Sequence, residues 1–159
     1  MTAMLEREVE RARRLFGHAS RIEDVASVIG HDRPGDAAVL REALGGLLAD
    51  ARPLPPGVAA RLLEVSDTTV RMWVRTGLLI AAPGTRRLDA SRLHHVARLV
   101  QQLRREGRRQ NLREALWRRL EDDTLVRRDD LVESLAQMRR GDLIRAVTFE
   151  EEQAGPAHR

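Results

Sequence analysis

The sequence of 159 residues contains no cysteine, no tyrosine and no lysine, and only two tryptophans and two phenylalanines. Without cysteine, disulfide bonds, thiolate catalysis and cysteine-ligated zinc sites are excluded. A core with so few aromatic rings has to be built from leucine, valine, isoleucine and alanine, and this composition favours helices over sheets. The sequence therefore predicts a mainly α-helical protein.

A long apolar segment is also missing. No run approaches the roughly 20 apolar residues that a membrane-spanning helix needs. Residues 1–7 become charged at once and do not form the apolar core of a signal peptide. We therefore expect a cytoplasmic protein that does not enter a membrane.

Patterns typical of catalytic and metal sites are absent as well. There is no glycine-rich phosphate loop and no nucleophile elbow. His94 and His95 are adjacent, so on a helix they would point about 100° apart and would not share a metal ion. The acidic pairs at 122–123 and 129–130 are explained by helix capping and surface charge. We therefore expect no enzyme, no metal site and no cofactor.

Positive charge is concentrated in the middle of the chain. Residues 52–119 hold 15 arginines and 5 acidic residues, a net charge of +10, whereas residues 1–51 have a net charge of −2 and residues 120–159 a net charge of −4. A GC-rich genome would explain the use of arginine alone, but it would not explain the clustering. A basic centre between acidic ends predicts a module that binds a polyanion.

Hydrophobic periodicity and glycine or proline signals divide the chain into three regions. In the first, we expect a helix over residues 2–16 that ends at Gly17, a short helix over 22–29 and a third over 36–50. The three prolines between residues 52 and 57 predict a domain boundary. The predicted regions are a helical region 1–51, a central domain 54–120 and an acidic C-terminal region 121–159.

The acidic C-terminal region is expected to contain a helix that ends near Arg140, separate from a helix over 111–120. A disordered tail is expected from Phe149.

Residues 54–90 have the pattern of two short helices joined by a tight turn and followed by a small wing. The first helix is expected over 56–65, and the second from Asp67 to Thr76, where Gly77 stops it. Residues 78–81 and 86–88 predict two short β-strands, a small β-hairpin around the turn between them. In such a unit the first helix packs behind, and the second presents its outer face to base edges in the major groove.

Helical spacing assigns the two faces of the second helix. Its inner face consists of Val70, Trp73 and Val74. Its outer face consists of Asp67, Thr68, Arg71, Met72 and Arg75, and Thr69 lies near the boundary. Arg71 has the reach for a guanine or a phosphate, and the two threonines have the size for a thymine methyl group or a phosphate.

Residues 58–79 resemble the winged helix-turn-helix of MerR-like and excisionase proteins. The shared pattern is a helix of small residues, Val65 before the turn, a Thr-Val pair at 69–70, Trp73 three residues later and a Gly-x-Leu exit at Gly77. Residues 84–88 resemble the wing of this family, although Thr85 and Leu88 stand where members have His and an aromatic residue.

This resemblance implies a mainly α fold with a central winged helix-turn-helix that binds double-stranded DNA. The residues that it implies for the major groove are Thr68, Thr69, Arg71 and Met72, and those for phosphate or wing contacts are Arg75, Arg86 and Arg87. We therefore predict a sequence-specific transcription regulator, a repressor that acts as a homodimer. A heptad-like seam can pair with a second subunit or pack within its own chain; it consists of Leu93, Val96, Val100 and Leu103.

The acidic C-terminal region favours an alternative hypothesis. Residues 129–143 combine a short amphipathic helix with a polar segment, and they resemble the toxin-binding ends of small bacterial antitoxins. An acidic segment of this kind can become ordered on a basic partner. The chain would then neutralise a toxin protein and regulate its own operon through DNA binding. The residues expected to contact the toxin are Leu131, Leu135, Met138 and Leu143.

Overall fold

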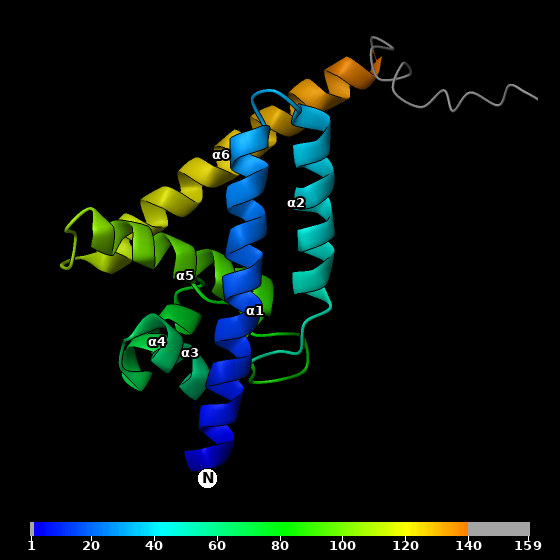
Figure 1. Cartoon of the computed structure of the whole chain (residues 1–159). Coiled ribbons are helices and arrows are strands. Elements are labelled where there is room, and N and C mark those ends of the chain that lie inside the picture. The colour runs from blue at the N-terminus through cyan, green and yellow to red at the C-terminus, as the bar shows by residue number, and fades with distance from the viewer. Residues whose placement is uncertain (1, 140–159) are drawn as a thin grey trace, which may run out of the picture. The chain divides into compact units, whose positions relative to one another are not determined.

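The computed structural model describes the backbone of residues 2–139 and the side chains of residues 2–126 and 128 (Figure 1). Within this part the regular secondary structure consists of six α-helices, so the expectation of a mainly α protein is confirmed. The chain forms two compact units, residues 1–119 and residues 120–159. The domain boundaries predicted near residues 52 and 120 stay predictions.

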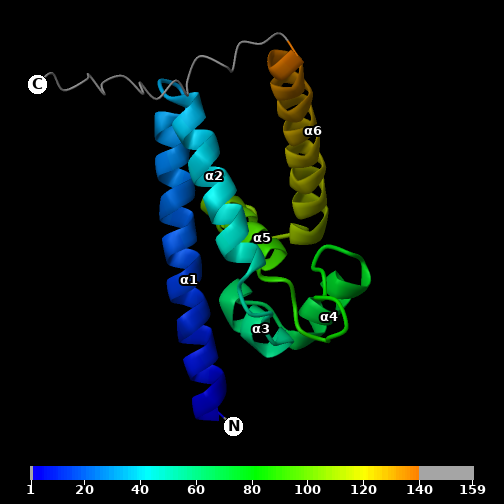
Figure 2. The same cartoon turned by 90° about the vertical axis from the view of Figure 1, so that its right-hand side faces the viewer.

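The first two helices, α1 (Thr2–Ile29) and α2 (Pro34–Ala49), lie side by side as a helical hairpin (Figures 1 and 2). α1 is one continuous helix, so the break predicted at Gly17 is wrong. Packing on both sides of this glycine explains the difference, because Phe16 and Ser20 both contact His94. These contacts outweigh the cost of about 1 kcal/mol that a glycine imposes in a helix interior.

The next two helices, α3 (Pro56–Leu63) and α4 (Asp67–Arg75), are short and are joined by three residues. They occupy the positions predicted for the helix-turn-helix, to within two residues at each end. α3 also packs against the N-terminal half of α1, where Val9 and Ala12 form a small core with Val58. The helix-turn-helix is therefore attached to the N-terminal hairpin by a shared apolar core.

Helix α5 (Ala90–Arg105) contacts both α2 and α3. The four residues of the heptad-like seam are at most 1% exposed within the single chain. Of the two uses predicted for the seam, the structure therefore shows internal packing. A second subunit has no access to these side chains.

Helix α6 (Leu112–Arg139) is also continuous, whereas two separate helices were predicted. Residues 121–129 contain no glycine and no proline, so nothing in the sequence interrupts the backbone hydrogen bonds between the two predicted helices. The absence of helix breakers was therefore the better guide to this region.

The predicted wing forms a loop, and the described residues contain no β-strand. Leu88 makes one isolated bridge with Ala81 and another with Leu54, and the second consists of two backbone hydrogen bonds of 2.9 and 2.7 Å. Proline explains why neither bridge extends into a ladder. Pro53 and Pro55 flank Leu54 and Pro83 follows the first predicted strand, and proline has no N–H to donate.

Candidate nucleic-acid interface

Helix α4 begins at a well-formed N-cap. The Ser66 hydroxyl accepts a hydrogen bond from the backbone N–H of Thr69 at 3.1 Å, and the two side-chain oxygens lie 2.9 Å apart. Asp67 adds a negative charge to the first turn, where the helix dipole favours it. The side chain of Thr69 is therefore engaged in the cap, while that of Thr68 stays exposed.

The turn before α4 is fixed by an arginine from another helix. Glu64 has a left-handed backbone conformation, with φ of 53°, which is typical of a helix C-terminus. The Arg104 guanidinium of α5 donates to the carbonyl oxygen of Leu63 at 2.7 Å and to that of Glu64 at 3.3 Å. It also forms an ion pair of 3.2 Å with the Glu64 carboxylate. Arg104 thus satisfies the last carbonyls of α3 and holds the turn against α5.

The other end of α4 is fixed in a similar way. Gly77 follows the helix with φ of +80°, a conformation that L side chains rarely adopt. The Arg92 guanidinium of α5 donates to the carbonyl oxygen of Leu78 at 2.9 Å and to that of Gly77 at 3.4 Å. Burial lowers the pKa of Arg92 from its usual value, and the negative charge of Asp89 acts in the opposite direction.

The two faces of α4 are arranged as the spacing predicted. Val70 and Trp73 are buried, with at most 2% exposure, and Val74 is half-buried. The opposite face is exposed over two turns of the helix, and it consists of Thr68, Arg71, Met72 and Arg75. The structure thus brings together four of the five predicted residues of α4, and Thr69 lies half-buried at their edge.

The arginines of this exposed face have no ion-pair partner among the described residues. This holds for Arg71 and for Arg75, whose side chains extend from a helix held at both ends. An unpaired guanidinium keeps all its N–H donors for an external acceptor, such as a phosphate or a guanine.

A further arginine lies beside this face and was not singled out in the sequence. The guanidinium of Arg113, in the first turn of α6, donates to the sulfur of Met72 at 3.7 Å. Trp117 in the next turn lies near Gly77, at 3.9 Å from the position that a side-chain Cβ would take there. The only sequence signal for Arg113 is its place inside the +10 segment, because its distance from α4 along the chain conceals the contact.

The two predicted wing arginines differ from each other. Arg86 is exposed and forms no ion pair with any described residue. Arg87 is also exposed, but its guanidinium lies 3.6 Å from the Glu8 carboxylate of α1 and donates to the carbonyl oxygen of Pro53 at 3.4 Å. Its side chain therefore connects the loop to α1.

The arginines between residues 104 and 109 also differ from one another in their contacts. Arg104 is structural, as described above, whereas the other three arginines are exposed and form no ion pair within the described part of the chain; they are Arg105, Arg108 and Arg109. Glu106 between them pairs with Arg119 at 2.9 Å. Three cations thus remain available near the start of α6.

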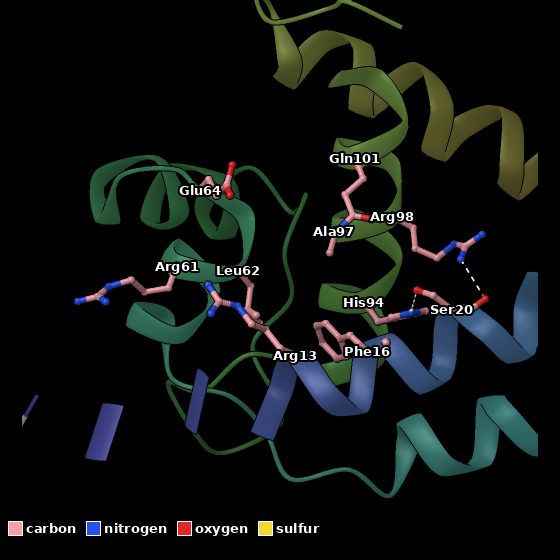
Figure 3. Close-up of a pocket in the computed structure, with 11 residues that line it drawn as sticks. Arg13, Phe16, Ser20, Arg61, Leu62, Glu64, His94, Ala97, Arg98 and Gln101 are labelled. Carbon is pink, nitrogen blue, oxygen red and sulfur yellow. Dashed lines mark hydrogen bonds between the residues drawn. The ribbon is translucent and has the colours of Figure 1, made fainter. Parts of the chain in front are cut away.

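A cavity of about 380 Å³ lies behind the helix-turn-helix, between α1, α3 and α5 (Figure 3). Arg13 extends from α1 toward α3 at one side, while Arg98 is turned to Ser20, Glu23 and Asp24 of α1 at the other. The ring of His94 packs edge-on against Phe16, with a centroid distance of 5.0 Å, and lies 3.3 Å from the Ser20 hydroxyl.

Burial lowers the pKa of His94 to about 4, and the positive charge of Arg98 contributes, while a hydrogen bond with the backbone of Phe16 opposes the shift. His94 is therefore a neutral core residue at pH 7.

The residues predicted to contact a toxin fall largely outside the described side chains. Leu131, Leu135 and Met138 belong to the described backbone of α6, but their side chains are not described, and Leu143 lies outside the described residues altogether. Their predicted role remains a prediction.

The described residues contain neither a metal-binding cluster nor a helix that could span a membrane. No group of three or more His, Asp or Glu side chains in this part is placed to hold a metal ion. None of its helices combines the length and the apolar character that crossing a membrane requires.

Comparisons of the chain with family models, with curated proteins and with solved structures find no match. The structure shows how the residues of the candidate interface are arranged. The resemblance to the MerR-like and excisionase group rests on the sequence pattern of residues 58–79.

Proposed function

We propose that this protein is a sequence-specific DNA-binding regulator that places α4 in the major groove of double-stranded DNA. The observation that supports this most directly is the exposed face of α4. It presents two unpaired arginines, a threonine and a methionine on a short helix fixed at both ends, within a segment of net charge +10. Rigid presentation matters because base readout requires several side chains to meet fixed atoms in the groove at once.

The side chains of the interface take different roles in this proposal. Arg71 lies in the middle of the exposed face and donates to a guanine edge, while Thr68 and Met72 contact neighbouring bases. Arg75 and Arg86 bind phosphates. Thr69 and Arg87 already have partners within the chain, so we assign them to positioning α4 and the loop.

A variant of Arg71 tests the groove assignment. We expect Arg71→Ala to weaken binding to the preferred duplex by roughly 1–3 kcal/mol and to relax the sequence preference at one position. Arg33→Ala is the matched control, because Arg33 is an exposed arginine in the α1–α2 loop, paired only with its neighbour Asp36. Equilibrium titrations at one fixed salt concentration measure both. Equal affinity of Arg71→Ala and the unmodified protein would contradict the groove assignment.

Arg113 extends the proposed interface beyond the helix-turn-helix. Because it lies at the edge of the exposed face beside Met72, we assign it to a phosphate that flanks the reading helix. Arg113→Ala should weaken binding to preferred and random duplexes by similar factors and lower the salt slope by about 1. A loss confined to the preferred duplex would instead make Arg113 a base-reading residue.

Regulation by a repressor requires that the bound protein occupy an operator, and a single small reading helix gives too little contact for this. Proteins that read DNA in this way commonly bind two half-sites as a dimer. We therefore include a homodimer and repression in the proposal. The antitoxin alternative depends on side chains at 131–143 that the structure does not describe, and it stays a prediction.

A further inference from the structure

Four of the exposed large apolar side chains of unit 1 lie in the part of the α1–α2 hairpin formed by the C-terminal end of α1 and by α2. Val25 and Val28 of α1 are 52% and 76% exposed, and Val39 and Leu47 of α2 are 64% and 59% exposed. Single exposed apolar residues are common on protein surfaces, whereas several on two packed helices can mark an interaction surface. α2 contributes little polar surface to offset them, because only Asp36, Arg41 and Glu42 among its 16 residues are charged.

These side chains lie on the open face of the hairpin. α5 covers the other face, where it contacts Phe16, Ser20 and Glu23 of α1. Consecutive helix residues are rotated by about 100°, so Val25 projects from the side of α1 opposite Phe16, and Val28 lies about 60° around the helix from Val25. Figures 1 and 2 show α1 and α2 running side by side, and exposed residues run along both helices.

The charges on this open face are segregated between the two helices. On α1, the stripe that ends in the two valines begins with exposed positive or titratable residues, at helical spacings of 4, 3 and 4; these are Arg14, His18 and Arg21. On α2, the exposed stripe of Val39, Ala43 and Leu47 ends at Asp50. Neither Arg14 nor Arg21 has an ion-pair partner among the described residues.

Asp50 is placed unfavourably for its own helix. It is the C-cap residue of α2, where the helix dipole disfavours negative charge. Asp36 at the other end of α2 already pairs with Arg33 at 2.7 Å. The Asp50 carboxylate is therefore the acceptor on α2 that an arginine of a second copy of the chain would bind.

We infer that the open face of the α1–α2 hairpin is the surface on which a second copy of this chain docks, to form a four-helix bundle. A two-fold axis parallel to the helices places α1 of one copy over α2 of the other. The apolar stripes of the two copies then cover each other. The basic stripe of each α1 lies against Asp50 of the other copy, so this ionic contact forms twice. An arrangement with α1 over α1 would bring the arginines together and is disfavoured by their repulsion.

The inference deepens the proposed function, because it locates the homodimer that two half-sites require. The heptad-like seam of α5 does not serve this purpose, since it is buried within the single chain. The hairpin is attached to α3 through the small core around Val9 and Val58, so pairing two hairpins would join two reading helices.

The oligomeric state of the full chain without DNA provides the test. We expect a dimer by light scattering and sedimentation, and we expect Val25→Asp and Leu47→Asp each to raise the dimer dissociation constant by at least about tenfold, because each buries a charge in the apolar interface. Ile80→Asp is the matched control, since Ile80 is 50% exposed but lies in the loop after α4. Circular dichroism confirms that each variant keeps its helices.

A charge exchange tests the orientation of the two hairpins. Arg14→Glu should weaken the dimer, and adding Asp50→Arg to the same chain should restore most of the loss, because each new pair again has opposite charges. A monomer at all concentrations, or an unchanged dimer with both aspartate variants, would overturn the inference. These results are separate from DNA binding. A monomer that binds DNA refutes the docking surface and the homodimer but not the role of α4 as a reading helix, whereas a dimer that binds no DNA refutes the DNA-binding function but not the docking surface.

Discussion

At the residue scale, His94 shows how the core responds to pH. In the unfolded chain its pKa returns to the ordinary value of 6.5, whereas in the folded protein burial holds it at about 4. Between these values the unfolded state binds more protons, so the free energy of unfolding falls as the pH falls through this window. The full loss, reached below pH 4, is on the order of 3 kcal/mol.

Two histidine variants isolate this contribution. We expect His94→Gln to make the free energy of unfolding less dependent on pH between about pH 7 and pH 4, as measured by urea denaturation. His31→Gln is the control, because His31 is exposed in the loop between α1 and α2 and lies outside the core. If the His94 variant kept the full dependence of the unmodified protein, His94 would not be the group that titrates.

The candidate site residues show what spacing along the chain can predict. The periodicity of α4 assigned Val70 and Trp73 to the core and Arg71 to the surface, because side-chain direction in a helix follows from position alone. Partners from distant segments were not predictable. The contact of Arg113 with Met72 and the pairing of Arg87 with Glu8 depend on which helices pack together, and no local pattern encodes this.

At the scale of elements, α4 ends at a glycine that the backbone requires. Gly77 has φ of +80°, and we expect Gly77→Ala to lower the free energy of unfolding by about 1–2 kcal/mol, because an L side chain is strained there. Gly17→Ala is the same change inside α1, where nothing lies within 4 Å of the added Cβ, and it should stabilise by about 0.5–1 kcal/mol. Urea denaturation measures both, and equal effects of the two substitutions would contradict this account of Gly77.

The boundaries of the elements were predictable where capping chemistry is local. Ser66 and Gly77 mark the two ends of α4 in the sequence as in the structure. The prediction failed at Gly17, where packing of α1 against α5 outweighs the local preference. It failed again at the wing, where prolines on both sides of the pairing segments limit β-structure to isolated bridges.

Across the molecule as a whole, the charge counts show that residues 52–119 are basic. They do not show which of these arginines bind other helices of the chain and which remain free of ion pairs. Of these arginines, Arg92, Arg98 and Arg104 hold helices together, and those on α4 and near the start of α6 remain free of ion pairs within the described residues. For residues 1–51 the sequence pattern indicates no role beyond helical packing or assembly. The structure shows them as a hairpin whose open face carries exposed apolar and charged side chains, which is the basis of the docking surface inferred above.

The most direct test of the central claim is selection of bound sequences from a random pool of DNA duplexes, followed by titration of the selected duplex. We expect the purified chain to enrich a recurring motif, and we expect Arg71→Ala to bind this motif at least about fivefold more weakly, the factor that corresponds to a loss of about 1 kcal/mol. Arg33→Ala should bind it as the unmodified protein does. If no motif is enriched, or if Arg71→Ala binds the selected duplex as tightly as the unmodified protein, α4 is not a DNA-reading helix.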